Sequence, residues 1–330
     1  MIKILFFIET LSGGGAEKVL QNLVNNMDKE KFDITVQTVW REDPEKYLNK
    51  NIRYKYIYPC YSKLNNYKYR LSVLLKTIYP RYIKDSYDIE IAYLECGATK
   101  VISTSTNKNA KKFAWVHCDL SKKMSNINEF KRKSVNWYKK FDKVVCVSRD
   151  VEKSFKSIYG SEFDTKVIYN VIDDYSIKEK SDETVDDYSF DEKSPTIVSV
   201  GRLSKEKRFD RLIEAHKLLL DNGISNNLLI IGKGDEREVL EQIIISSGVQ
   251  STVTLAGFKS NPYPYIKKAD LLACSSDYEG FSSFIAEGLI LGKAIVTTEC
   301  TGMEELLGNS QAETAKVLSN LMLMYMKVTS

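Results

Sequence analysis

Residues 3–16 of the chain read KILFFIETLSGGGA, and this stretch decides the fold. Lys3–Ile8 is an almost continuous apolar run, which is typical of a strand covered on both faces. A glycine turn follows, and from about Ala16 apolar residues recur at helical spacing. A second strand fits Asp33–Val39. The order strand, glycine turn, helix, strand predicts a parallel, doubly wound α/β sheet.

The same alternation returns in the second half of the chain. Strands are predicted at Thr196–Val200 and Asp270–Ala273, and each is followed by a loop and a helix. Residues 174–194 are acidic and poor in aliphatic side chains, which predicts an extended domain linker. Since 330 residues exceed one comfortable core, we expect two Rossmann-like domains that face each other across a cleft, residues 1–173 and 195–330.

Composition excludes several classes of protein. A hydrophobic content of 43% rules out wholesale disorder, and no run approaches the roughly 18 apolar residues of a membrane-spanning helix. The opening segment lacks the cleavage pattern of a signal peptide, and the six cysteines are scattered, as in a reducing compartment. These features predict a cytoplasmic protein. Two histidines and the lack of a D-x-D pair predict that no metal ion is bound.

Charge is divided unequally between the two halves. Residues 1–170 hold 31 Lys and Arg against 19 Asp and Glu, whereas residues 171–330 hold 17 against 25. Two interpretations remain open. Two solvated surfaces attract each other across a cleft, or the basic half approaches an anionic membrane surface or a phosphorylated substrate.

Residues 54–93 contain ten of the 20 tyrosines, interleaved with Lys and Arg. Apolar residues recur there at helical spacing, namely Leu71, Leu74, Leu75, Ile78 and Tyr82. The pattern fits an amphipathic covering helix whose basic side is exposed to solvent and has no further role. It also fits a surface that faces a membrane or an acceptor, where Tyr and Lys lie at the level of lipid headgroups.

A basic loop follows the strand predicted at Thr196–Val200 and has the sequence GRLSKEK, residues 201–207. In an open parallel sheet such a loop lies at the carboxyl end of its strand, where ligands bind. Arg202 and Lys207 can both reach an anion there. The guanidinium of Arg202 can donate two parallel hydrogen bonds, and the ammonium of Lys207 acts as a point charge. The alternative is that the loop carries only ordinary surface charges.

Two glutamates flank the start of a later helix. Glu279 lies on the loop after the strand predicted at Asp270–Ala273, and Glu287 lies about one turn into the following helix. The free N–H groups of the helix start, near Ser282 and Ser283, suit a diphosphate. The two carboxylates can accept hydrogen bonds from the vicinal hydroxyls of a sugar or a ribose.

The first half offers a histidine and a glycine turn. His117 follows the strand predicted at Lys112–Val116, and at a strand end it can donate, accept or shuttle a proton. His216 lies inside a predicted helix and is interpreted as structural. The glycine turn at residues 13–15 fits the dinucleotide fingerprint incompletely, because Lys18 stands at its last position, and residues 232–234 fail the same test. The first turn is either a phosphate-approaching turn or simply a tight one.

Four motifs together resemble the family-4 glycosyltransferases, which are retaining enzymes of the two-Rossmann GT-B fold that use nucleotide sugars without a metal. The resemblance covers residue 1 to about residue 308. Its motifs are the GGAE turn at residues 14–17, the W-x-H segment at 115–117, the G-R-x-x-x-x-K loop at 201–207 and the E-x7-E signature from Glu279 to Glu287.

The resemblance implies roles on the donor side. Arg202 and Lys207 would hold the donor diphosphate. Glu279 would contact the transferred sugar near the reacting carbon, and Glu287 would contact the ribose hydroxyls. Backbone amides at the start of the helix would contact the sugar and the phosphates. These amides belong to Phe281, Ser282, Ser283 and Phe284. From the opposite domain the phosphate would be approached by Gly14 and Gly15.

The resemblance also implies a mechanism, with Glu279 and His117 as the catalytic residues. His117 would line the acceptor side near the anomeric carbon. The acceptor would attack on the face of the leaving group and a phosphate oxygen would take its proton, so that no strong protein base is required. Two fixed cations and a helix dipole would stabilise the charge that develops on the diphosphate.

The chain departs from the family pattern at two places. Ser282 stands where the family commonly has a proline after E-G-F, which binding through the backbone should tolerate. Residues 308–330 do not align with the family's C-terminal elements. They are interpreted either as a substitute helix or as a truncated or frame-shifted end, and the second interpretation is the one we favour.

The sequence therefore predicts a retaining hexosyltransferase of cell-surface polysaccharide biosynthesis of the bacterial type. Its donor would be a nucleotide-diphosphate sugar, most commonly a UDP-sugar, and its acceptor a saccharide or a lipid-linked saccharide, with no cofactor. We expect peripheral contact with the cytosolic membrane face through the basic half, and no nucleic acid. The alternative is a truncated nucleotide-sugar-binding subunit that is inactive or needs a partner. A nucleotide-sugar epimerase fits less well, because two histidines supply too few acid–base groups.

Overall fold

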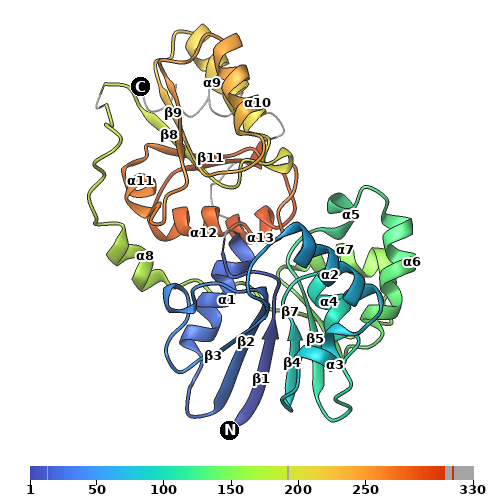
Figure 1. Cartoon of the computed structure of the whole chain (residues 1–330). Helices are drawn as coiled ribbons and strands as arrows, with labels where there is room; N and C mark the ends of the chain where they lie inside the picture. Colours follow the sequence, from blue (N-terminus) through green and yellow to red (C-terminus); the bar gives the residue numbers. More distant parts are fainter. Residues whose placement is uncertain (13, 192, 309–313, 316–330) are drawn as a thin grey trace. The chain divides into compact units, whose positions relative to one another are not determined.

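The computed structural model describes residues 1–12, 14–191, 193–308 and 314–315 of the chain (Figure 1). The chain divides into two compact units, Met1–Val171 and Ile172–Ser330. Each unit is built on its own parallel sheet, as the order of strands and helices along the sequence predicted.

The described part of the first unit forms a seven-stranded sheet in which all neighbouring strands are parallel. The strands lie in the order β3 (Arg53–Tyr58), β2 (Phe32–Trp40), β1 (Ile2–Phe7), β4 (Ile89–Ala92), β5 (Lys111–Val116), β6 (Lys143–Cys146) and β7 (Thr165–Val167). The helices are α1 (Gly15–Asn26), α2 (Lys63–Leu74), α3 (Ile78–Tyr82), α4 (Gly97–Ile102), α5 (Leu120–Lys123), α6 (Ile127–Tyr138) and α7 (Arg149–Tyr159), with a 3-10 turn η1 (Pro44–Lys46).

β1 is an inner strand of this sheet, flanked by β2 and β4, and its apolar sequence explains its position. Leu5 and Phe7 pack into one buried cluster, while Ile4 and Phe6 are buried on the opposite face. A strand with apolar side chains on both faces belongs between two layers of helices. Strand order runs outward from β1 through β2 to β3 and then resumes on its other side at β4. The connections therefore diverge between β1 and β4, which makes the carboxyl ends of these strands a switch point where ligands bind.

The second unit repeats this plan. In its described part the parallel strands lie in the order β10 (Val253–Gly257), β9 (Asn227–Ile231), β8 (Thr196–Val200), β11 (Leu271–Cys274), β12 (Ile295–Thr298) and β13 (Thr314–Ala315). The helices are α8 (Asp174–Lys180), α9 (Phe209–Asp221), α10 (Arg237–Ser246), α11 (Tyr263–Lys268), α12 (Ser283–Ile290) and α13 (Met303–Leu307), with a 3-10 turn η2 (Lys205–Lys207). The switch point of this sheet lies between β8 and β11.

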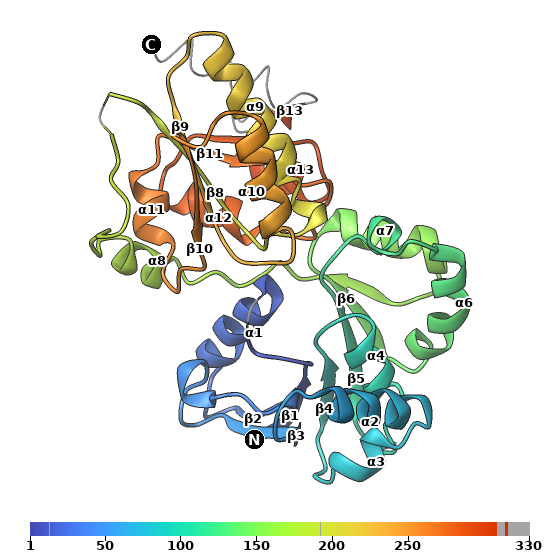
Figure 2. The ribbon, with the colours of Figure 1, turned by 45° about the horizontal axis from the view of Figure 1, so that its top comes forward.

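Successive residues of the inner strands β8 and β9 pack into two separate hydrophobic cores in the second unit. Ile197 packs with α9 and α10, whereas its neighbour Val198 packs with α8, α11 and α12. β9 divides in the same way, since Leu228 joins the first core and Leu229 the second. Figure 2 shows α9 and α10 on one side of this sheet and α11 on the other. Covering both faces is what continuous apolar strands require.

The acidic segment 174–194 differs from the extended linker that the sequence predicted. It begins with the helix α8, and Ile177 of that helix is buried in the core of the second unit. Its carboxylates pair with side chains of the same unit, Asp182 with Lys267 and Asp187 with Lys259. The segment is thus held to the second unit, because its few apolar residues have a core to enter and its charges have partners.

Within residues 54–93 the apolar residues from Leu71 to Tyr82 were expected on one covering helix, but the structure divides this stretch between two helices. The segment contains most of β3, then α2 and α3. Ile78 is buried, but Leu71, Leu74 and Leu75 are exposed to solvent. The interpretation as a covering helix with a merely basic outer side is therefore incomplete, because the outer side is also apolar. Of the atypical end, residues 308–330, only 308 and 314–315 belong to the described residues, and β13 pairs with β12.

The glycine turn at residues 232–234 has a packing role. A Cβ atom on Gly234 would lie 2.1 Å from the carbonyl oxygen of Leu203, and one on Gly232 would lie 1.8 Å from that of Gly201. The backbone N–H of Leu203 donates to the carbonyl of Lys233 at 3.0 Å. Because these glycines have no side chain, their backbone packs directly against the backbone of the basic loop at residues 201–207 and holds that loop in place.

We expect Gly234→Ala to lower the free energy of unfolding by about 1–3 kcal/mol, because the added methyl group meets backbone that cannot move aside. Gly201→Ala is the matched control, since a Cβ there would meet its nearest atom at an ordinary 3.5 Å. Chemical denaturation of the full chain measures both. Equal stabilities of the two variants would contradict this account of the turn.

Candidate functional site

The second unit gathers its predicted residues at the switch point of its sheet. β8 and β11 are hydrogen-bonded neighbours, so the loops that follow them start side by side. The first loop carries Arg202 and Lys207, and the second carries Glu279 before the start of α12. Residues that lie about 70 positions apart along the chain therefore meet at one edge of the sheet.

Lys207 and Glu279 are in direct contact. The ammonium Nζ lies 2.6 Å from Oε1 of Glu279, and both side chains are largely buried. The same carboxylate oxygen accepts a hydrogen bond from the hydroxyl of Ser276 at 2.7 Å. Burial by itself would lower the pKa of Lys207, but the Glu279 carboxylate and nearby Cys274 raise it above its ordinary value. The lysine therefore stays positively charged and the glutamate is held in one place.

Further bonds tie the two loops together. The Ser275 hydroxyl donates to the carbonyl of Lys207, and the Asp277 N–H donates to the carbonyl of Glu206, both at 2.8 Å. Arg211 of α9 bonds the Asp277 carboxylate at 2.8 Å. This network fixes the position of Lys207 relative to Glu279 before any ligand arrives, which is the preorganisation that binding of a charged group needs.

The start of α12 lies directly after Glu279. Ser282 caps the helix, since its hydroxyl accepts from the N–H of Ile285. The helix start comprises the other predicted backbone contacts, Phe281, Ser283 and Phe284. Glu287 is buried inside α12 and accepts a hydrogen bond from the hydroxyl of Tyr263 at 3.4 Å. Arg202 is exposed on the basic loop.

The first unit has its own polar cluster at the carboxyl ends of β4 and β5. His117 follows β5 as predicted, and Glu95 follows β4. The buried carboxylate of Glu95 accepts from the backbone N–H of His117 at 3.1 Å and from the thiol of Cys118 at 3.1 Å. Lys123 of α5 lies 2.7 Å from it. One buried carboxylate thus holds the segment that carries the histidine.

This environment sets the charge of both residues. Burial by itself would raise the pKa of Glu95, but the charge of Lys123 and the hydrogen bonds that it accepts lower it to about 2. Burial lowers the pKa of His117 to about 4, although the charge of Glu95 opposes that change. At neutral pH His117 is therefore an uncharged imidazole, which donates or accepts a hydrogen bond but is a weak base.

The His117 ring lies in an aromatic setting with unused hydrogen-bonding groups. Its centroid is 4.8 Å from that of Tyr93, and it stacks on Trp115 at 6.5 Å. Three buried atoms there have no hydrogen-bond partner among the described residues, namely Nε2 of His117, Nε1 of Trp115 and the hydroxyl of Tyr93. Unpaired buried polar atoms each cost about 1–3 kcal/mol and are uncommon, so their gathering marks a candidate binding site.

The predicted glycine turn lies at the start of α1. Gly14 is the cap residue and Gly15 the first residue of the helix, while Gly13 lies outside the described residues. A Cβ atom on Gly14 would lie 2.2 Å from the carboxylate of Glu17, which also accepts from Thr10 at 3.1 Å. The acid of the GGAE turn is thus folded over the helix start. An anion that approaches Gly14 has to displace it.

Sequence reasoning missed Glu95, Lys123 and the pair formed by Glu9 and Tyr69. The signal for Glu95 was available, because it follows an apolar strand just as His117 does. Lys123 carries no such signal, since its distance from Glu95 depends on the path of the chain after β5. The hydroxyl of Tyr69 donates to Glu9, which follows β1, at 3.0 Å.

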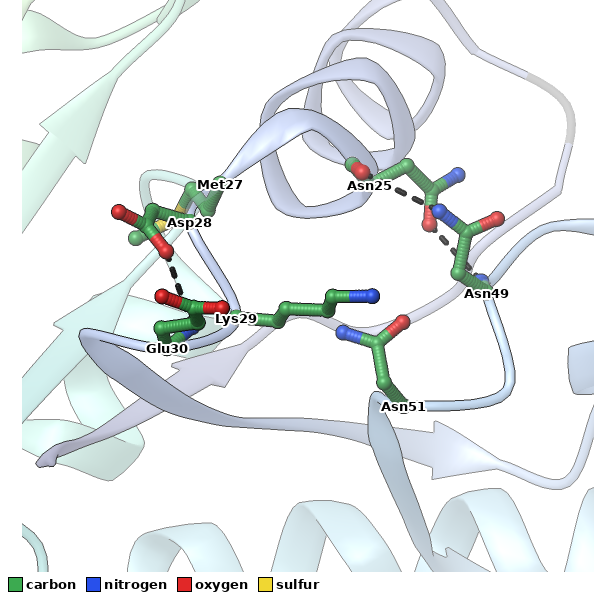
Figure 3. Close-up of a pocket in the computed structure, with 7 residues that line it drawn as sticks. All are labelled: Asn25, Met27, Asp28, Lys29, Glu30, Asn49 and Asn51. Carbon is green, nitrogen blue, oxygen red and sulfur yellow. Dashed lines mark hydrogen bonds between the residues drawn. The ribbon is translucent and has the colours of Figure 1, made fainter.

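Two other features lie apart from these clusters. A polar pocket lies at the amino ends of β2 and β3, the edge opposite to the switch point, and is lined by Asn25, Met27, Asp28, Lys29, Glu30, Asn49 and Asn51 (Figure 3). Two of its asparagines are already bonded to each other, since the backbone N–H of Asn49 donates to the side chain of Asn25 at 2.9 Å. In the described ranges, which omit 13, 192, 309–313 and 316–330, no three His, Cys, Asp or Glu side chains are placed to hold a metal ion.

The pKa of His117 makes stability depend on pH. In the unfolded chain the ring titrates near 6.5, and in the folded chain near 4, so the unfolded chain binds more protons between these values. The free energy of unfolding should therefore fall as pH drops from 6.5 to 4, by up to about 3 kcal/mol from this residue. His117→Gln should flatten that part of the curve.

Denaturation of both proteins at several pH values measures the difference, because contributions shared by both cancel. Parallel stability curves for the wild type and the variant would show that His117 is not held neutral by the fold.

Two family models match the chain, one for each unit. Residues 13–175 match Glycosyltransferase Family 4, and residues 180–318 match Glycosyl transferases group 1. Together they leave only short stretches of the 330 residues unmatched.

Individual proteins agree with these models. A stretch of 147 residues is 33% identical to the N-acetylgalactosamine-N,N'-diacetylbacillosaminyl-diphospho-undecaprenol 4-alpha-N-acetylgalactosaminyltransferase of Campylobacter jejuni, covering 44% of this chain and 38% of that protein. The chain therefore matches well under half of that relative's length. An uncharacterized glycosyltransferase of Haemophilus influenzae is 23% identical over 94% of this chain and 85% of its own.

A solved structure shows the same fold. HepE of Anabaena, in complex with UDP and glucose, has a TM-score of 0.76 and 20% identity, covering 100% of this chain and 90% of that one. This likeness confirms the predicted α/β architecture of two Rossmann-like units. Because the two family models follow each other along nearly the whole sequence, the chain belongs to the family-4 glycosyltransferases of the GT-B fold.

Proposed function

We propose that the chain transfers a hexosyl group from a nucleotide-diphosphate sugar to a saccharide or lipid-linked acceptor, with retention of configuration and without a metal. Assembly of a cell-surface polysaccharide is the process that fits such a reaction. The name of the Campylobacter relative describes transfer to a diphospho-undecaprenol-linked sugar, and HepE was solved with UDP. The first supports a lipid-linked acceptor, and the second supports a UDP-sugar donor.

The observation that carries the proposal is the contact between Lys207 and Glu279 beside the start of α12. We propose that Lys207 and Arg202 bind the donor diphosphate, and that the backbone amides at residues 281–284 add to this binding. Glu279 would then contact the transferred sugar, and the buried Glu287 the ribose hydroxyls. The leaving group is an anion, so a fixed cation and a helix start lower the energy of its departure.

We propose that Gly14 and Gly15 approach the donor phosphate once Glu17 has moved, and that His117 lines the acceptor side. A neutral imidazole with a free nitrogen suits a hydrogen bond to a sugar hydroxyl better than it suits proton removal. The acceptor proton would therefore pass to an oxygen of the departing phosphate, on the face where the acceptor attacks.

Calorimetric titration with UDP and GDP in the presence of EDTA tests the donor. Turnover of the matching nucleotide sugars with saccharide and lipid-linked acceptors then tests transfer, and proton NMR of the product gives its anomeric configuration. Binding and transfer with retention are expected. Failure to bind any nucleoside diphosphate would overturn the proposal, and an inverted product would overturn its mechanism.

Lys207→Met and Glu279→Gln should each lower kcat/KM by about 100-fold or more, because each removes a fixed group from the reacting centre. Each should also lower the free energy of unfolding by about 1–3 kcal/mol, because its partner is left unpaired in a largely buried place.

The double variant separates these two effects. Without either charge the fold should regain much of the lost stability, while turnover should stay at the level of the weaker single variant. Recovery of turnover together with stability would show that the pair is only structural.

A further inference from the structure

Helix α2 presents an apolar stripe to solvent. The exposed fractions are 62% for Leu64, 65% for Tyr67, 42% for Leu71, 67% for Leu74 and 62% for Leu75, the residue after the helix. At about 100° per residue these positions fall within one stripe of roughly 100° along the helix. A helix on a globular protein normally turns such a stripe toward the core, and here the stripe points outward.

The other side of α2 is firmly attached to the first unit. Tyr69 is its buried residue and packs on Trp40, with ring centroids 5.9 Å apart. Val73 packs against the same core cluster, and Ser62 caps the helix by accepting from the N–H of Asn65 at 3.1 Å. α2 lies beside α3 in both views (Figures 1 and 2). The orientation of the stripe is therefore fixed by packing.

Positive charges border the stripe. Lys63 and Arg70 lie along one edge and Lys68 along the other, and all three are exposed. No Asp or Glu occurs between residues 46 and 84, whereas ten Lys and Arg do. Tyr61, which is 65% exposed, continues the apolar surface just before the helix. Leucines and tyrosines between cations form the pattern of a helix that lies in a membrane interface.

We propose that α2 lies in the plane of an anionic membrane surface, with its leucines among the lipid chains and its Lys and Arg at the headgroups. The charge decides in favour of anionic lipid. A second copy of the chain would bring the same cations face to face across a two-fold axis. The helix has 12 residues, about 18 Å, which is too short to cross the roughly 30 Å core of a bilayer. The described residues contain no helix long and apolar enough to span a membrane.

We extend this proposal, on the basis of the proposed function, to the cluster of Glu95 and His117, which would line the acceptor side. Tyr69 reaches from the buried side of α2 to Glu9, and the pKa of Glu9 is raised by burial and by the charge of Glu95. Gly97, two residues after Glu95, leaves room for the Glu9 carboxylate, since a Cβ there would lie 1.9 Å from it. These contacts connect the buried side of α2 to the residues around Glu95, where a lipid-linked acceptor would be received.

Vesicle flotation of the full chain tests the proposal. The probes are phosphatidylcholine vesicles with and without phosphatidylglycerol. The test variant is Leu64→Ser, Leu71→Ser, Leu74→Ser, and the matched control is Val239→Ser, Ile245→Ser, which changes exposed apolar residues on α10 of the second unit. Salt-sensitive binding of the wild type to the anionic vesicles is expected. The test variant should bind at least about tenfold more weakly, and the control should bind like the wild type.

Thermal unfolding should be unchanged in both variants, because every altered side chain is exposed. Equal flotation of the test variant and the wild type would overturn the proposal, and so would absence of wild-type flotation. A dimer that the test variant dissociates would show that the stripe contacts a second copy instead.

Transfer to a lipid-linked acceptor in vesicles should fall in the test variant, while transfer to a water-soluble acceptor should not. Flotation without any nucleotide binding would leave the membrane surface standing and overturn the transferase.

Discussion

The contact between Lys207 and Glu279 depends on one constraint, the adjacency of β8 and β11 in a parallel sheet. Parallel strands end at the same edge, and at a switch point their connections leave in opposite directions. That gap admits a lysine from one loop and a glutamate from the other. Three features hold these two loops in place. They are the backbone bonds between the loops, the close packing at Gly232 and Gly234, and the cap of α12.

In the first unit the neighbouring parallel strands β4 and β5 also end at one edge, but the groups that follow them are different. Its buried carboxylate, Glu95, is stabilised by Lys123 and by a backbone N–H, and His117 is kept neutral beside it. A charged imidazole there would add a second buried charge, with a desolvation cost that one carboxylate only partly offsets. The second unit therefore supplies a fixed cation, and the first supplies neutral hydrogen-bonding groups.

Local sequence predicted the elements better than their contacts. Continuous apolar runs such as Lys3–Ile8 are typical of strands covered on both faces, and the residues after such parallel strands lie at the ligand-binding edge. For that reason Lys207, Glu279 and His117 were predicted at strand ends. The bond between Lys207 and Glu279, and the pairing of Glu95 with Lys123, depend on strand order and loop path, which a single sequence does not encode in any short pattern.

The two differences from the predicted fold share one physical cause. Periodicity shows that Leu71, Leu74 and Leu75 share a helix face, but not whether that face meets a core or solvent. Acidic composition shows that residues 174–194 prefer water, but not that Ile177 has a core within reach or that Lys259 and Lys267 pair with carboxylates of the segment. In both cases the burial of a side chain depends on the groups that it can contact, and a local sequence pattern does not contain those groups.

Exposed leucines on a well-anchored helix are costly for an isolated protein, because a contiguous apolar patch invites association. The cations that border the α2 stripe reduce that cost, since they repel a second copy and attract an anionic surface. The proposed arrangement would thus suit an anionic lipid surface and would oppose self-association. Under the proposed function this combination would suit the enzyme, because its nucleotide-sugar donor would come from water and its lipid-linked acceptor from the membrane.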